Sequence, residues 1–149
     1  MSSQVAAVLA LVLAGGLVSY WRGGPPEKLA AAIIVGWVFS DAVYHLLFGP
    51  SRFDSVDPVH VVLDGAELAA IMWLALRANR MWPLWAAAAQ LLCVSGHIAA
   101  FIEPGGFRRA YWAMTNMPQY IQLTALLLGA AAHARRERRV GRYRSWRLA

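Results

Sequence analysis

Residues 82–102 of the chain read WPLWAAAAQLLCVSGHIAAFI and contain no Asp, Glu, Lys or Arg. Because an α-helix rises about 1.5 Å per residue, a helix of this length crosses roughly 30 Å, the thickness of the hydrocarbon core of a bilayer. Pro83 suits the first turn of such a helix, and Pro104 with the two glycines after it ends the run. The stretch therefore predicts a membrane-spanning helix.

Four other apolar segments surround this run, each close to the same length. Charged residues, or glycines and prolines that cannot continue a helix, separate them. The composition agrees, because 59% of the residues are hydrophobic and 15% are charged, against about 25% charged in typical soluble proteins. We therefore expect an all-α integral membrane bundle of about five helices in residues 1–134 and a basic tail in residues 135–149. The four segments are residues 4–20, 28–48, 58–76 and 109–133.

The positive charges predict the orientation of this bundle. The formal net charge is +6, and seven of the fourteen Lys and Arg residues lie in the tail. With five spans, the tail shares one side of the membrane with the connections that hold Arg22, Lys28, Arg77 and Arg80. Since positive charges collect on the cytoplasmic side, we expect a multi-pass inner-membrane protein with a periplasmic N-terminus and a cytoplasmic C-terminus. Outside the tail the chain is nearly neutral, so we expect no nucleic-acid partner.

Two stretches carry a resemblance to a broad class of proteins. One runs from Trp82-Pro83-Leu84-Trp85 through Gln90 to His97, and the other is the segment 120–129 leading into the basic end. With these stretches the chain resembles the short, alanine- and tryptophan-rich multi-pass proteins of unassigned function that are common in proteobacterial inner membranes. The resemblance implies the same location and no particular activity.

Ionisable and amide side chains recur on one face of each of the later four segments. A charged residue in a span costs about 2.5–3.5 kcal/mol on insertion scales, so each needs a partner or a function. Residues three, four or seven apart share a helix face, and the distances from the span ends place these side chains in the outer half of the membrane. The sequence thus predicts a polar cluster that opens to the periplasm, above an apolar inner half. Its members are Asp41, His45, Asp64, Glu67, His97, Asn116 and Gln119.

Two other histidines are expected to have structural roles. His60 shares a helix face with Asp64 and Glu67 but lies near the span end, so we expect it in a helix interface. His133 lies beside the arginines of the inner end and belongs to the basic collar there. The single cysteine, Cys93, excludes an intrachain disulfide.

The function of the polar cluster stays open between several hypotheses. The first is interhelical packing in an accessory subunit that joins a larger membrane complex or a homo-oligomer, which the lack of a catalytic motif favours. The alternative is a periplasm-facing pocket, possible in three forms. It holds a haem between His45 and His97, or a small amphipathic ligand beside a carboxyl–imidazole pair that performs acid–base chemistry, or a metal ion. Whether the protein is an enzyme is left open. The metal ligands would be Asp41, His45, Asp64, Glu67 and His97.

The basic tail predicts a contact with anionic lipid, at about 1 kcal/mol for each arginine near the surface. Tyr143 and Trp146 would dip into the membrane interface, as the aromatic residues of amphipathic tails do. A simple topology anchor explains the same charges equally well. The tail arginines are Arg135, Arg136, Arg138, Arg139, Arg142, Arg144 and Arg147.

Overall fold

The structure is a computed structural model that describes residues 3–49, 55–103 and 108–147. Five α-helices make up nearly all of this part of the chain, and one isolated bridge between Ala78 and Trp146 is the only β pairing in it. The all-α prediction is therefore confirmed. The helices are α1 (Ser3–Arg22), α2 (Pro25–Phe48), α3 (Pro58–Arg77), α4 (Trp82–Ile102) and α5 (Arg108–Val140).

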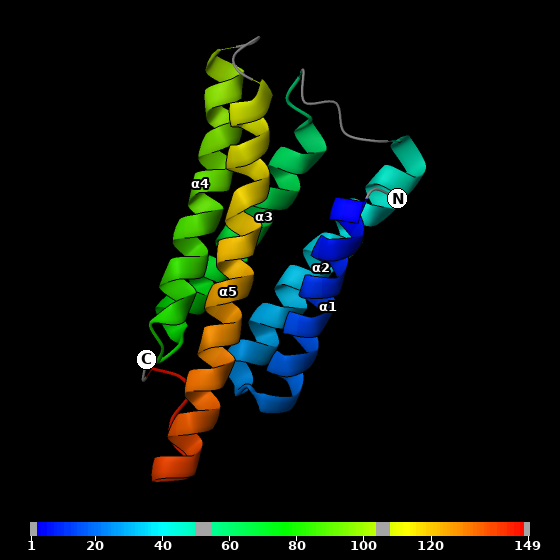
Figure 1. Ribbon diagram of the computed structural model, residues 1–149. Coiled ribbons are helices and arrows are strands. Elements are labelled where there is room, and N and C mark those ends of the chain that lie inside the picture. Colours follow the sequence, from blue (N-terminus) through cyan, green and yellow to red (C-terminus); the bar gives the residue numbers. More distant parts are fainter. Residues whose placement is uncertain (1–2, 50–54, 104–107, 148–149) are drawn as a thin grey trace.

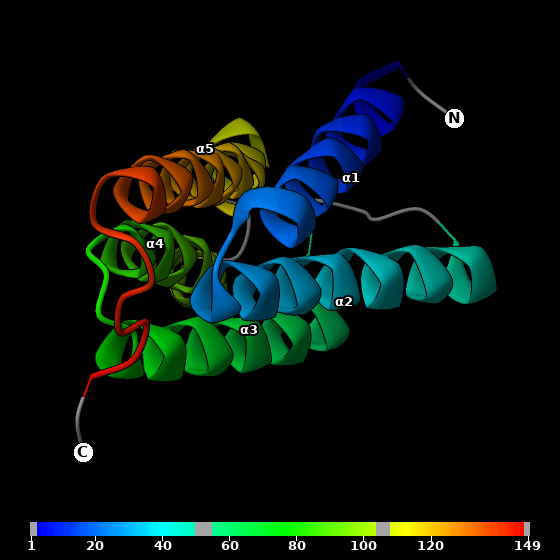
Figure 2. The same ribbon diagram turned by 90° about the horizontal axis from the view of Figure 1, so that it is seen from below.

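The helices form a bundle in which α3, α4 and α5 lie side by side (Figures 1 and 2). Helix α4 packs between α3 and α5, α2 packs against both α1 and α3, and α1 also rests on α5. Helix α2 runs antiparallel to α3, so the last turns of α2 and the first turn of α3 meet at one end of the bundle. The start of α2, the turn between α3 and α4, and the end of α5 gather at the opposite end.

Within the described residues, α2, α3 and α4 are long and apolar enough to cross a membrane. Most of the apolar residues in these three helices face outward, with Leu46 84% exposed and Phe101 78% exposed. A water-soluble domain rarely leaves such extended apolar surface uncovered. The structure therefore supports a membrane protein, whereas a count of five spans stays a prediction.

Local signals explain where two helices begin. Asp57 precedes α3 and accepts a hydrogen bond from the Val59 amide at 2.9 Å, as an N-cap residue does. Helix α2 begins at Pro25, three residues before the predicted start, because prolines fit the first turn of a helix. The carboxylate of Glu27 accepts a hydrogen bond from the Gly24 amide at 2.9 Å and closes this helix start.

The tail differs from the sequence expectation in its path. Helix α5 continues to Val140, so the predicted boundary between residues 134 and 135 lies inside a helix. The chain then folds back, and the Asn79 amide donates to the Ser145 carbonyl at 3.0 Å while the Arg147 amide donates to the Arg77 carbonyl at 2.8 Å. Trp146 packs beside Trp73, with ring centroids 6.4 Å apart, and contacts the core. A contact of the partly buried Trp146 with the membrane interface stays a prediction.

The core depends on small residues where helices approach closely. Trp82, the first residue of α4, is 8% exposed, and its ring lies against Gly129 of α5. A Cβ atom added to Gly129 would lie 2.4 Å from the Trp82 ring. Only a residue without a side chain leaves room for the indole at this position.

We expect Gly129→Ala to destabilise the protein by about 1–3 kcal/mol, because the Trp82 ring must move away from the new methyl group. The measurement is unfolding in mixed detergent, followed by tryptophan fluorescence. Gly65→Ala is the matched control, since a Cβ at Gly65 meets nothing within 4 Å. Equal stability of the two variants would show that the contact between α4 and α5 does not depend on Gly129.

Candidate metal centre

The structure divides the polar residues into three clusters. The α2–α3 cluster consists of Asp41, His45 and His60 with their outer partners Asp57 and Tyr44. The central network lies between α3, α4 and α5, and the tail cluster lies at the opposite end of the bundle from the α2–α3 cluster. The central network comprises Asp64, Gln90, Cys93, His97, Tyr111 and Gln122, and the tail cluster comprises Glu27, Arg80, Trp82, His133 and Tyr143.

Three potential ligand atoms converge in the α2–α3 cluster. Asp41 and His45 are four residues apart near the end of α2, and His60 is in the first turn of α3. The Nε2 atom of His60 lies 3.0 Å from Oδ1 of Asp41 and 3.2 Å from Nε2 of His45. The Nε2 atom of His45 lies 3.4 Å from the same Asp41 oxygen. The three atoms thus form a small triangle.

Hydrogen bonds on the far side of each ring orient the two imidazoles. Nδ1 of His45 donates to the Gly49 carbonyl at 2.8 Å, because a carbonyl can only accept. Nδ1 of His60 lies 3.2 Å from Oδ2 of Asp57. In a neutral imidazole with a proton on Nδ1, the lone pair is on Nε2. Both lone pairs therefore point to the same place as the Asp41 carboxylate.

Asp57 is itself held in place. The Tyr44 hydroxyl donates to its Oδ2 at 2.6 Å, and the Val59 amide donates to its Oδ1. Burial raises the pKa of Asp57, but the hydrogen bonds from Tyr44 and Val59 and the neighbouring His60 lower it, and the net pKa is below the ordinary value. Asp57 therefore stays ionised at neutral pH and can accept a hydrogen bond from the Nδ1–H group of His60.

This arrangement has the dimensions of a metal site. With metal–ligand bonds of about 2.1 Å, neighbouring donors lie about 3.4 Å apart in a tetrahedron and about 3.0 Å apart in an octahedron. The observed distances of 3.0, 3.2 and 3.4 Å lie in this range. Two imidazoles and one carboxylate are a ligand set for zinc and for Fe(II). The side chains of Asp41 and His45 are about one quarter exposed, so an ion can reach them from outside.

The central network, by contrast, is closed and internally paired. Nε2 of His97 lies 2.6 Å from Oδ2 of Asp64, and Nδ1 of His97 lies 2.9 Å from the Tyr111 hydroxyl. Gln90 donates to the other oxygen of Asp64, and the Cys93 thiol donates to Oδ2. Asp64, Cys93 and His97 are close enough for a metal ion, but all three are buried and bonded to one another or to their neighbours. The network thus links α3, α4 and α5 through paired side chains.

Glu67 adjoins this network through Gln122, to which its side chain is hydrogen-bonded. It is 4% exposed, and its Oε1 has no partner among the described residues. It lines a cavity of about 220 Å³ between α2 and α3, together with Trp37, whose indole nitrogen also lacks a partner in the described chain.

The tail cluster brings together residues that the sequence did not connect. Glu27 is fully buried, and its Oε1 accepts hydrogen bonds from the Trp82 indole at 2.8 Å and from Arg80 Nε at 3.3 Å. His133 lies 3.2 Å from Arg80 and 2.8 Å from the Tyr143 hydroxyl. Burial raises the pKa of Tyr143. The positive charges of Arg80 and Arg136 lower this pKa, and the negative charges of Glu27 and Glu137 raise it. The net pKa of Tyr143 is above the ordinary value, so the phenol keeps its proton.

The five ligands predicted from the sequence therefore fall into different places. Asp41 and His45 join His60, whereas Asp64 and His97 belong to the central network and Glu67 lies beside it. The two histidines of the haem hypothesis lie in different clusters: His45 contacts His60, whereas both ring nitrogens of His97 bond within the central network.

His60 is the ligand that sequence reasoning missed. The sequence does contain a hint of its role. Asp57 and His60 are three residues apart at the start of α3, and Asp41 and His45 are four apart near the end of the preceding helix α2.

Asn116 and Gln119 join none of the three clusters. The Asn116 amide donates to the Trp112 carbonyl at 2.9 Å and to the Thr115 hydroxyl, both on its own helix, and Gln119 is half-buried. Comparison with protein-family models, with curated proteins and with solved structures finds no match for this chain. The function is therefore inferred from the geometry of the residues.

We expect His97→Ala to destabilise the bundle by about 3 kcal/mol or more, because it leaves the buried Asp64 carboxyl without its nearest partner. Unfolding in mixed detergent measures the change. Ser95→Ala is the control on the same helix, since the Ser95 hydroxyl bonds only to the Leu91 carbonyl. A His97→Ala protein as stable as Ser95→Ala would contradict a packing role for the central network.

Proposed function

We propose that the protein is an integral inner-membrane protein that binds one divalent transition-metal ion at Asp41, His45 and His60. The observation that carries this proposal is the approach of two imidazole Nε2 atoms to 3.2 Å beside a shared carboxylate oxygen. Each ring engages a carbonyl or a carboxylate through its Nδ1 atom. Such outer hydrogen bonds are typical of metal-bound histidines, because they fix the tautomer and increase the basicity of the ligand.

The converging lone pairs favour a cation over simple interhelical packing. In a packing contact each acceptor meets a donor, as in the central network, where Gln122 donates to Gln90 and Gln90 donates to Asp64. In the α2–α3 cluster two imidazole nitrogens and a carboxylate oxygen converge within 3.4 Å of one another. A metal ion takes all three as ligands through separate bonds, whereas a proton on His60 Nε2 is shared between Asp41 and His45.

The three protein ligands occupy one side of the ion. In catalytic zinc sites three protein ligands leave a fourth coordination position for water or for a small molecule. In Fe(II) sites two histidines and one carboxylate leave several coordination positions open. The site therefore supports metal binding with an exchangeable ligand, which suits uptake, transfer or catalysis. The accessory role in a larger membrane complex stays a prediction.

Five spans place this site near the periplasmic surface. Three features support the proposed topology: the length of all five helices, the arginines at the end of the bundle that holds the tail, and the position of the α2–α3 cluster at the other end. Positive charges mark the cytoplasmic side. The ion would then enter from the periplasm.

We expect the purified full-length protein in detergent to bind one Zn²⁺ or Co²⁺ ion, and His60→Ala to lose this binding. Isothermal titration gives the stoichiometry, and the visible absorption of Co²⁺ reports the ligand geometry. Glu67→Gln is the control, because Glu67 belongs to the ligand set predicted from the sequence but lies outside the α2–α3 cluster. It should bind as the wild type does.

Asp57→Asn adds a finer test of the same site. Asparagine is also a good N-cap residue, so α3 should keep its start, but the charged partner of His60 Nδ1 is lost. We expect the affinity to fall by about 10–100-fold. A wild type that binds no metal, or a His60→Ala protein that binds as well as the wild type, would refute the proposed function.

A further inference from the structure

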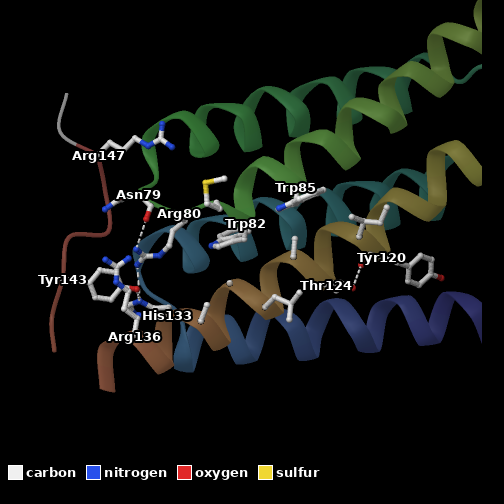
Figure 3. A pocket seen from close by; sticks show the side chains of 16 residues that line it. Asn79, Arg80, Trp82, Trp85, Tyr120, Thr124, His133, Arg136, Tyr143 and Arg147 are labelled. Atoms are coloured by element: carbon white, nitrogen blue, oxygen red, sulfur yellow. Dashed lines mark hydrogen bonds between the residues drawn. The ribbon is translucent and has the colours of Figure 1, made fainter. Parts of the chain in front are cut away.

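A groove of about 880 Å³ runs along α4, α5 and the returning tail, at the opposite end of the molecule from the α2–α3 cluster (Figure 3). Its volume lies within the roughly 300–1,000 Å³ typical of small-molecule sites. Trp85 and Leu128 line one part of it, and Arg136, Arg147 and Tyr143 line the other. The groove is thus apolar toward the middle of the bundle and cationic at the tail.

Two of the three arginines in the cationic part of the groove have no carboxylate partner in the described chain. The exception is Arg80, which is paired with the buried Glu27 at 3.3 Å. Arg136 and Arg147 are exposed and form no ion pair within the described residues. The guanidinium groups of Arg80 and Arg136 lie over the Tyr143 ring, 4.5 and 4.3 Å from its centroid. This packing holds the arginines at the mouth of the groove.

The apolar part is an open surface on helices that lie in the bilayer under the proposed topology. Trp85 is 68% exposed, Leu128 65% and Ile121 48%, and all three line the groove. Thr124 lies among them, and its hydroxyl bonds to the Tyr120 carbonyl of its own helix, so it offers little polarity. The surface therefore suits a hydrocarbon chain.

We propose that this groove binds one anionic phospholipid, with its phosphate at the arginine end that Arg136 and Arg147 line and an acyl chain along Trp85, Ile121 and Leu128. Charge complementarity identifies the occupant, because one molecule must satisfy two free guanidinium groups and an adjoining apolar channel. Arginines are well suited to phosphate. The site depends on the membrane location but not on the metal, so the two proposals fail independently.

The test is native mass spectrometry of the delipidated full-length protein in detergent, titrated with dioleoyl phosphatidylglycerol, dioleoyl phosphatidylcholine or inorganic phosphate. We expect one phosphatidylglycerol to bind in preference to phosphatidylcholine, and inorganic phosphate to bind much more weakly than the lipid. The double variant Arg136→Gln/Arg147→Gln should weaken phosphatidylglycerol binding by about 30-fold. Arg138→Gln/Arg139→Gln is the matched control, since it removes the same charge from exposed residues that do not line the groove.

A second variant tests the chain-binding part of the groove. Thr124→Trp fills it from the exposed side of α5 and leaves every arginine in place, so it should also lose the bound lipid. Equal losses in the two double variants would show a diffuse charge effect and overturn the proposal. Equal binding of the two lipids, phosphate binding as strong as lipid binding, or unchanged binding to Thr124→Trp would overturn it as well.

Discussion

A polar side chain inside a membrane-spanning helix has to find its partner within the protein, because the lipid offers none. This constraint determines how the helices of this bundle contact one another. Asp64 of α3 meets His97 and Gln90 of α4, and Gln122 of α5 reaches Gln90. Glu27 of α2 meets Trp82 and Arg80 at the other end. These pairs fix the positions of the helices, and alanine and glycine surfaces let them pack closely.

In the α2–α3 cluster, two imidazoles and a carboxylate converge instead of forming separate pairs. Its three converging atoms can all act as acceptors, and they are partly open to the outside, whereas the central network is closed. Under the proposed function, a metal ion occupies the position where these three atoms converge.

The two ends of the bundle thus have opposite chemistry. One end presents a carboxylate and two imidazoles, and the other presents arginines beside an apolar groove. A cation at the first end and an anionic lipid at the second would each neutralise the local excess of charge. Under the proposed topology the groove lies at the cytoplasmic headgroup level, where anionic lipids supply negative charge.

Periodicity and segment length predicted the helices because these are properties of a continuous stretch of chain. The Asp41–His45 pair could be predicted in the same way, since residues four apart share a helix face. Partners across helices could not, because they depend on how far each helix is rotated and shifted. Depth alone grouped Asp64 and His97 with Asp41 and left out His60. The role of Glu27 was not predicted, because the sequence placed this residue in the connection before the second helix. In the structure α2 already begins at Pro25, and Glu27 is buried in its first turn.

The most direct test of the metal site is X-ray absorption spectroscopy of the zinc-loaded, full-length protein in detergent. The site at Asp41, His45 and His60 predicts nitrogen and oxygen ligands at about 2.0–2.1 Å, scattering from two imidazoles, and no sulfur. A sulfur ligand at about 2.3 Å would place the ion at Cys93 in the central network and contradict the account.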